Sequence, residues 1–95
     1  MNDKPVPVAL FRLGHIVTTA NVAAQIGMDD MNDAIRRHQA GDWGELGEHD
    51  RQANDRGLVD SNRLFSVYHS TSGVKFWIIT EWDRSVTTVL LPEDY

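Results

Sequence analysis

Apolar positions recur with a period of two throughout the last third of the chain. Three runs rich in β-branched and aromatic residues, RLFSVYH (63–69), VKFWIITE (74–81) and VTTVLLP (86–92), are separated by the turn sequences STSG and WDRS. Alternation of this kind is typical of β-strands, and the short connections favour antiparallel neighbours. We therefore predict a three-stranded antiparallel β-meander.

The middle run of the meander is apolar on both of its faces. Val74, Phe76 and Ile78 occupy one set of alternate positions, and Trp77 and Ile79 occupy the other. A strand with one solvated face alternates apolar and polar residues, so this pattern predicts a central strand. It also predicts that helices cover one face of the sheet, and that the N-terminal strand, the third helix or a second subunit covers the other.

The N-terminal segment reads as a further strand. Residues 6–13 alternate in the extended pattern, which can continue through Ile16 and Val17. Pro7 has no N–H to donate, so we expect an edge strand or one that is only partly paired. The pattern leaves open whether this strand joins the meander.

Between the N-terminal strand and the meander, the apolar period changes to that of helices. Thr18 or Thr19 can cap a first short helix over ANVAAQI (20–26), which Gly27 would end in a left-handed conformation. Asp29 or Asp30 can cap a second helix that stops at Gly41. The buried stripe predicted for this second helix is Met31, Ala34, Ile35 and His38.

A third helix is predicted from about Trp43 to Arg56. Asp42 is followed three positions later by Glu45, which is the spacing of a capping box. The apolar face of this helix is poor, because it contains only Trp43, Leu46 and Ala53. We expect so polar a helix to lie on the surface or to offer its polar groups to a partner.

These elements predict a single α+β domain over residues 1–95, in the order strand, two to three short helices, then three strands (β-α-α-α-β-β-β). The 95-residue sequence contains no cysteine, and its Pro-interrupted start resembles neither a signal peptide nor a membrane span, so we expect a cytoplasmic protein. The net charge is −5, with 14 acidic against 9 basic side chains, which makes a nucleic-acid partner unlikely.

Two groups of residues could bind a ligand or a partner. His38, Asp42 and Trp43 surround a tight connection between the second and third helices, although turn glycines, a cap and an aromatic anchor explain the same residues without a ligand. The third helix carries Glu48, Asp50, Asn54 and Asp55 close together, as a binding surface or a solvated face would. No histidine has a metal-ligand spacing and no cofactor motif occurs, so we predict no metal and no cofactor.

Three stretches carry a resemblance to a known family: HQAGDWG (38–44), DRQAND (50–55) and ITEWDRSVTTVLLPEDY (79–95). They resemble a family of small bacterial proteins carried on plasmids and integrated elements, often labelled plasmid-related proteins. Some members are labelled type I restriction subunit M, an activity for which this chain has neither the length nor a glycine motif. The resemblance implies a mobile-element context and a host-defence or anti-defence role.

The order of elements is also similar to that of the RelE-like toxins that cleave messenger RNA on the ribosome. That analogy implies a phosphate-contacting role for Arg63 and Arg84 and a proton-transfer role for Tyr95 or His69. A simpler role for the WDRS turn pairs Arg84 with Glu81. We predict a non-enzymatic protein-binding module that is homodimeric through the meander or the N-terminal strand, with the RelE-like ribonuclease as the alternative.

Overall fold

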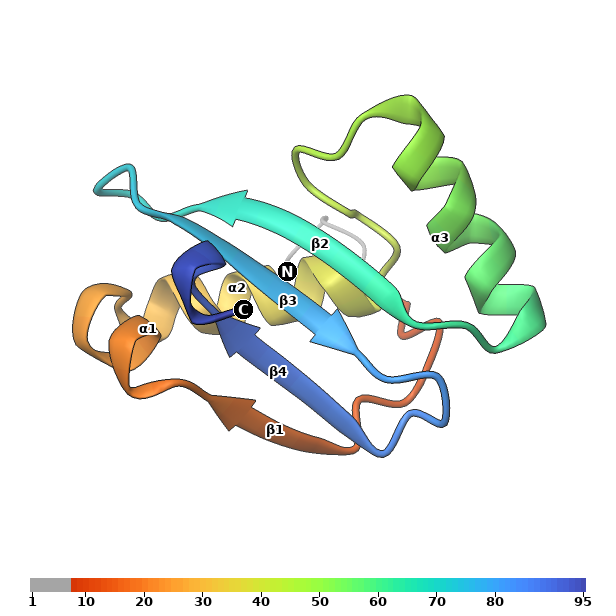
Figure 1. Cartoon of the computed structure of the whole chain (residues 1–95), viewed down its shortest axis with the longest axis horizontal. Coiled ribbons are helices and arrows are strands. Elements are labelled where there is room, and N and C mark those ends of the chain that lie inside the picture. Colours follow the sequence, from red (N-terminus) through yellow and green to blue (C-terminus); the bar gives the residue numbers. More distant parts are fainter. Residues whose placement is uncertain (1–7) are drawn as a thin grey trace, which may run out of the picture.

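The sheet of this protein is mixed, and helices cover one of its faces (Figure 1). The computed structural model describes residues 8–95. Over these residues the fold is α+β, with three α-helices, a four-stranded sheet and a short C-terminal 3-10 helix. The elements are β1 (His15–Thr18), α1 (Ala20–Gln25), α2 (Met28–Gln39), α3 (Glu48–Asp60), β2 (Leu64–His69), β3 (Lys75–Thr80), β4 (Val86–Leu90) and η1 (Pro92–Asp94).

The predicted meander is confirmed, and it is joined by a fourth strand. β2 pairs antiparallel with β3, and β3 pairs antiparallel with β4, so that β3 is a central strand. β1 pairs with the outer side of β4 in parallel, in the register from His15↔Val86 to Thr18↔Val89. The strand order is therefore β1-β4-β3-β2, with β1 and β2 at the two edges.

The N-terminal strand begins later than the sequence predicted. Residues 8–14 form no strand, and the predicted positions 6 and 7 lie outside the described residues. The backbone of this segment bonds to the end of α2 instead of the sheet. Leu10 donates its N–H to the Gln39 carbonyl at 2.8 Å, and the Gln39 amide donates to the Phe11 carbonyl at 2.8 Å. The apolar residues Val8 and Leu10 of the alternating pattern are exposed, and Phe11 and Leu13 are half-buried.

The first two helices follow the predicted pattern with two corrections, one of which is that Asp29 and Asp30 lie in the first turn of α2 and do not cap it. Thr19 caps α1, because its hydroxyl accepts the Val22 N–H at 3.2 Å. Gly27 is not left-handed: its φ is −70°, and it is the N-cap of α2. Gly41, at φ +82°, supplies the left-handed residue that ends α2. Its N–H bonds to the His38 carbonyl while the next N–H reaches back to Arg37, as in a Schellman motif.

The predicted start of the third helix was wrong by five residues. α3 begins at Glu48 with Gly47 as its N-cap, and Trp43–Leu46 are not helical. This segment is instead extended beside β2, where Gly44 forms a parallel bridge with Val67. Two backbone hydrogen bonds join it to Val67, one to the Trp43 carbonyl and one from the Glu45 N–H. The surface position predicted for α3 is confirmed, since Asn54 and Gly57 are its only buried residues.

The main core lies between the sheet and the pair α1 and α2. Met31, Ala34 and the α1 residue Val22 meet Phe76, Ile78 and Val89 there, among other buried side chains. A second cluster of buried residues, Trp43, Leu46, Leu64 and Val67, lies between α3 and β2. No helix in the part of the chain that the structure describes is long and apolar enough to cross a membrane.

Candidate functional site

His38, the first residue proposed for binding, lies in the core with no exposed surface. Its Nδ1 is 2.5 Å from the Ser66 hydroxyl, and its Nε2 is 2.9 Å from the Thr80 hydroxyl. Thr80 contacts Thr87 at 2.8 Å, and Thr87 donates to the Leu13 carbonyl at 2.7 Å. Because a carbonyl can only accept, Thr87 uses its one hydroxyl proton on Leu13 and must accept from Thr80. Thr80 has then used its own proton and must accept from His38. Nε2 of His38 carries the proton, and Nδ1 accepts from Ser66.

Burial also keeps this imidazole neutral. Desolvation, with a smaller contribution from the nearby Arg84 charge, lowers the pKa of His38 to about 3. Phe11 and Trp43 pack edge-on against the ring at centroid distances of 5.2 and 5.6 Å. His38 therefore links α2 to three strands of the sheet and offers nothing to an external ligand.

Asp42 and Trp43 are also engaged within the protein. The Asp42 carboxylate pairs with the Arg37 guanidinium at 2.7 Å and accepts the Gly44 N–H at 3.2 Å. The Arg37 hydrogen bond holds the pKa of Asp42 below its usual range. Trp43 is buried, and its indole N–H donates to Asp55 at 3.1 Å. Trp43 is thus the aromatic anchor that the sequence offered as the alternative to ligand binding. The cap predicted for Asp42 is wrong, because α3 has Gly47 as its N-cap and Asp42 pairs with Arg37.

The polar residues predicted to bind a partner on α3 divide into two kinds. Asn54 is buried against the edge of β2, where its amide oxygen accepts the Phe65 N–H at 3.2 Å and its amide nitrogen donates to the Phe65 carbonyl at 2.6 Å. Asp55 is the acceptor for Trp43. Glu48 and Asp50 are exposed, and the one side-chain contact recorded for them joins Glu48 to Gln52. Only Glu48 and Asp50 remain available to a partner.

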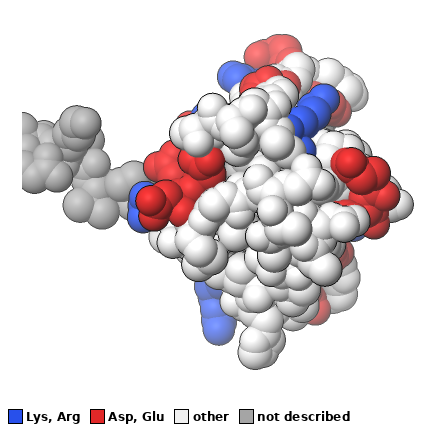
Figure 2. All heavy atoms as spheres, turned by 90° about the vertical axis from the view of Figure 1, so that its left-hand side faces the viewer, with Lys and Arg blue, Asp and Glu red and all other residues white. Residues whose placement is uncertain are grey.

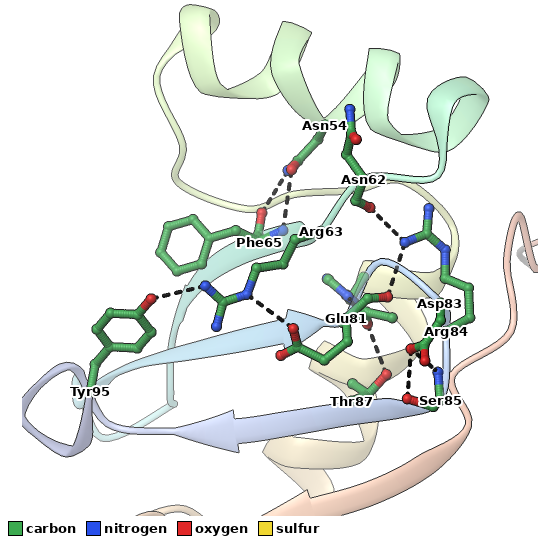
Figure 3. Close-up of polar contacts among 12 residues, drawn as sticks. Asn54, Asn62, Arg63, Phe65, Glu81, Asp83, Arg84, Ser85, Thr87 and Tyr95 are labelled. Atoms are coloured by element: carbon green, nitrogen blue, oxygen red, sulfur yellow. Dashed lines mark hydrogen bonds and ion pairs between the residues drawn. The ribbon is translucent and has the colours of Figure 1, made fainter.

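Arg84 is a structural residue that joins the β3–β4 turn to the end of α3. Its guanidinium donates to the backbone carbonyls of Gly57 at 3.0 Å, Asn62 at 2.6 Å and Glu81 at 3.2 Å (Figure 3). The predicted pairing of its side chain with the Glu81 carboxylate is wrong, because that carboxylate pairs with Arg63 at 3.5 Å. Arg84 therefore has few donors left for a phosphate.

The sheet face away from α1 and α2 carries an apolar hollow that few residues cover. A concave space of about 270 Å³ is lined by Arg63, Phe65, Trp77, Ile79 and Tyr95, which we call the outer aromatic face. The Trp77 ring lies edge-on to Phe65 at 5.0 Å and to Tyr95 at 5.8 Å. The C-terminal residues bring Tyr95 back across the sheet, and its side chain is 71% exposed.

Arg63 forms the polar rim of the outer aromatic face. Its Nη1 donates to the Tyr95 hydroxyl at 2.9 Å, and its Nε faces Glu81 (Figure 3). The Tyr95 hydrogen bond and the Glu81 charge raise the pKa of Arg63. The Trp77 indole N–H is buried with no hydrogen-bond partner among the described residues. Leaving such a donor without a hydrogen-bond acceptor costs about 1–3 kcal/mol.

The sequence indicated part of this surface. The two-faced apolar pattern of β3 singled out Trp77 and Ile79, and the RelE-like analogy singled out Arg63 and Tyr95. The structure brings these four together with Phe65 and leaves Arg84 apart from them at the β3–β4 turn. Among the described residues, no group of three or more His, Asp or Glu side chains is placed to hold a metal ion.

Neither a protein-family model, nor a curated protein, nor a solved structure matches this chain. The plasmid-borne family and the RelE-like order therefore stay predictions.

Proposed function

We propose that this protein is a non-enzymatic protein-binding module, and that an apolar segment of a partner protein docks on the outer aromatic face. The observation that carries this proposal is the contrast between the two faces of one sheet. α1 and α2 bury one face, whereas on the other face Phe65 and Trp77 are only partly buried and line an open hollow with Arg63 and Tyr95.

The composition of this face matches that of binding surfaces. Aromatic residues and arginine are enriched at the energetic centres of protein interfaces, because each provides a large contact area and a polar tip. The face presents three aromatic rings and one guanidinium within a single hollow. The surface is also firm, since Asn54 holds the backbone of Phe65 from the side. A firm surface loses little entropy when it binds.

The acidic character of the chain supports the proposal in a different way. At the end of the molecule formed by α1 and the β2–β3 turn, Asp and Glu lie in separate groups around a central area without charged side chains (Figure 2). Separate groups of this kind would steer association and exclude wrong partners. The net charge of −5 therefore favours a protein over a nucleic acid as the partner.

The biological setting that we propose rests on the family resemblance. A small acidic binding module of mobile-element origin would act on another protein encoded by the host or by the element, as an accessory factor in defence or counter-defence. Such a role needs a binding face and no catalytic group, and the outer aromatic face would be that binding face.

Affinity purification of the tagged full-length chain from its host, followed by binding titration with the captured partner, tests the proposal. We expect Tyr95→Ala or Arg63→Glu to weaken partner binding by about tenfold or more, because each removes a contact at the hollow. Both side chains are exposed, so the variants should fold normally. Matched controls are Val59→Ala on the exposed surface of α3 and the acidic-helix double variant Glu48→Lys, Asp50→Lys.

Two outcomes would contradict the docking site. Binding that survives both Tyr95→Ala and Arg63→Glu rejects the outer aromatic face. Binding that is lost only in the Glu48 and Asp50 variant moves the interface to the acidic surface of α3. Substitution of Asp55 is not informative here, because it also breaks the hydrogen bond to Trp43.

The alternative function, a RelE-like ribonuclease, is supported by the contact between Arg63 and Tyr95 on the open sheet face. A guanidinium beside a phenol could stabilise a phosphate and move a proton. The variant Tyr95→Phe separates the two functions, since it keeps the ring and removes the hydroxyl. A nuclease would lose about 100-fold or more of its messenger RNA cleavage, whereas a binding module would keep most of its partner affinity. Intact messenger RNA after incubation with ribosomes and wild-type protein excludes the nuclease.

A further inference from the structure

The two edge strands of the sheet differ in whether other parts of the chain bond to their outward-facing backbone groups. At the β2 edge, Phe65 exchanges both backbone groups with the Asn54 amide. Val67 likewise exchanges both of its groups with the neighbouring segment, because its N–H donates to the Trp43 carbonyl at 3.2 Å and its carbonyl accepts the Glu45 N–H at 2.8 Å. The outward-facing groups of both residues are therefore satisfied within the chain.

The β1 edge has no such cover within residues 8–95. β1 is the terminal strand of the sheet, and all four of its residues are exposed. The bonds from the His15 N–H to Ser85 and from the Thr19 N–H to Val89 show that the odd-numbered residues face β4. The backbone N–H and carbonyl groups of Ile16 and Thr18 therefore point away from the sheet. They form the unpaired edge that invites another strand.

The side chains of β1 lack the features that normally prevent edge-to-edge pairing. Natural edge strands are protected by lysine, proline, bulges or inward-pointing charges. The strand His15–Thr18 has none of these, and its two apolar side chains are about half exposed: Ile16 by 49% and Val17 by 47%. No acidic residue occurs between Val8 and Asn21. Two copies of this net-acidic chain could therefore approach along β1 without repulsion between acidic side chains.

We propose that β1 pairs antiparallel with β1 of a second copy of this chain, with the two-fold axis at Val17. In this register, Ile16 lies opposite Thr18 of the second copy. Their outward backbone groups then form the closely bonded pairs of an antiparallel ladder. Val17 faces Val17 of the second copy in the non-hydrogen-bonded position, where side chains come closest. A shift by one residue would turn the outward groups away from each other. A register centred on Ile16 or Thr18 would pair only one of these two residues within β1, whereas the register centred on Val17 pairs both.

The dimer would form one continuous eight-stranded sheet. Val17 pairs with Thr88, which alternates with the core residues Thr87 and Val89, so Val17 lies on the face away from α1 and α2. A two-fold axis perpendicular to the sheet keeps both outer aromatic faces on this same side. The proposal is independent of the proposed function, because β1 and the outer aromatic face lie on different strands and are tested by different variants.

Cysteine cross-linking in the full-length chain tests the register directly, because the natural sequence contains no cysteine. We expect Val17→Cys to form a disulfide-linked dimer on mild oxidation, since non-hydrogen-bonded partners in an antiparallel pair lie within the range that a disulfide spans. Ile16→Cys should cross-link much more slowly, because its counterpart in the second copy lies two positions along the strand. Val59→Cys, on the 84% exposed surface of α3, measures random collision.

Light scattering on eluted fractions provides the second measurement. The wild-type protein should reach twice the mass of the 10.7 kDa chain as its concentration rises from micromolar to millimolar. Val17→Lys should shift this transition to concentrations about tenfold higher or more, because it places two like charges face to face. Cross-linking of Val17→Cys no faster than Val59→Cys, or a wild-type protein that stays monomeric at millimolar concentration, would overturn the proposal. Faster cross-linking of Ile16→Cys would overturn the register.

Discussion

Gly44→Ala is expected to lower the free energy of unfolding by about 3 kcal/mol or more, because one methyl group adds both backbone strain and a direct clash. Gly44 has φ +74°, a left-handed conformation that costs other residues about 1–2 kcal/mol. Its added Cβ would also lie 1.9 Å from the Val67 carbonyl oxygen and 2.8 Å from the Tyr68 ring. Since the backbone must move to relieve these contacts, the bridge that covers the β2 edge should open. Urea denaturation monitored by circular dichroism measures the loss.

Gly73→Ala is the matched control for this prediction. Gly73 also has a left-handed φ, +88°, but nothing lies within 4 Å of the position where its Cβ would be. It should lose only the conformational part, about 1–2 kcal/mol. Gly27→Ala, at an ordinary φ and in open space, should change stability by less than about 0.5 kcal/mol. Equal losses for Gly44→Ala and Gly73→Ala would show that the contact with Val67 contributes nothing.

The second large effect is a loss of stability on mild acidification, caused by His38. The folded protein holds His38 neutral with a pKa of about 3, whereas the unfolded chain titrates it near 6.5. Between these values the unfolded state binds the additional proton, so acid favours unfolding. The stability from this group is complete above pH 6.5 and is lost as the pH falls toward 3. The expected slope is about 1.4 kcal/mol per pH unit over that interval.

The variant His38→Gln separates this effect from the titration of carboxylates. Glutamine can still donate to and accept from the neighbouring hydroxyls, but it does not titrate in this range. We expect His38→Gln to be less stable than the wild type at pH 7 and nearly independent of pH between 6.5 and 4.5. The lowered pKa values of Asp42, Asp83 and Asp94 add a further loss of stability only as the pH falls below about 4. Equal slopes for both proteins above pH 4.5 would contradict the assignment to His38.

Much of the fold could be predicted because the relevant signals are local. The meander follows from an alternating pattern that each strand carries alone, and the buried stripe of α2 follows from the helical spacing of Met31, Ala34 and His38. The sequence could offer Thr18 or Thr19 as a cap, and the structure has Thr19, because a cap hydroxyl acts only three residues away. These features depend on residues that are close together in the sequence, and the packed structure agrees with them.

The candidate site was predicted less well, because residues with suggestive chemistry had structural partners far along the chain. His38 contacts Ser66 and Thr80, and Asn54 contacts the backbone of Phe65. Contacts of this length leave no periodic signal in a single sequence. The capping-box spacing of Asp42 and Glu45 was misleading for the same reason, since the segment around Gly44 bonds to Val67 at the edge of β2, 23 positions away in the sequence.

Local pattern was thus enough to establish the α+β class, the order of the elements, the central position of β3 and the polarity of α3. Three features depended on the folded chain as a whole: the parallel pairing of β1 with β4, the burial of His38 within a line of hydroxyl groups, and the assembly of Arg63, Trp77 and Tyr95 on one open face. The physical reason is that periodicity records which side of an element is apolar. Which distant backbone and polar groups satisfy one another is decided only when all the elements compete for the same partners.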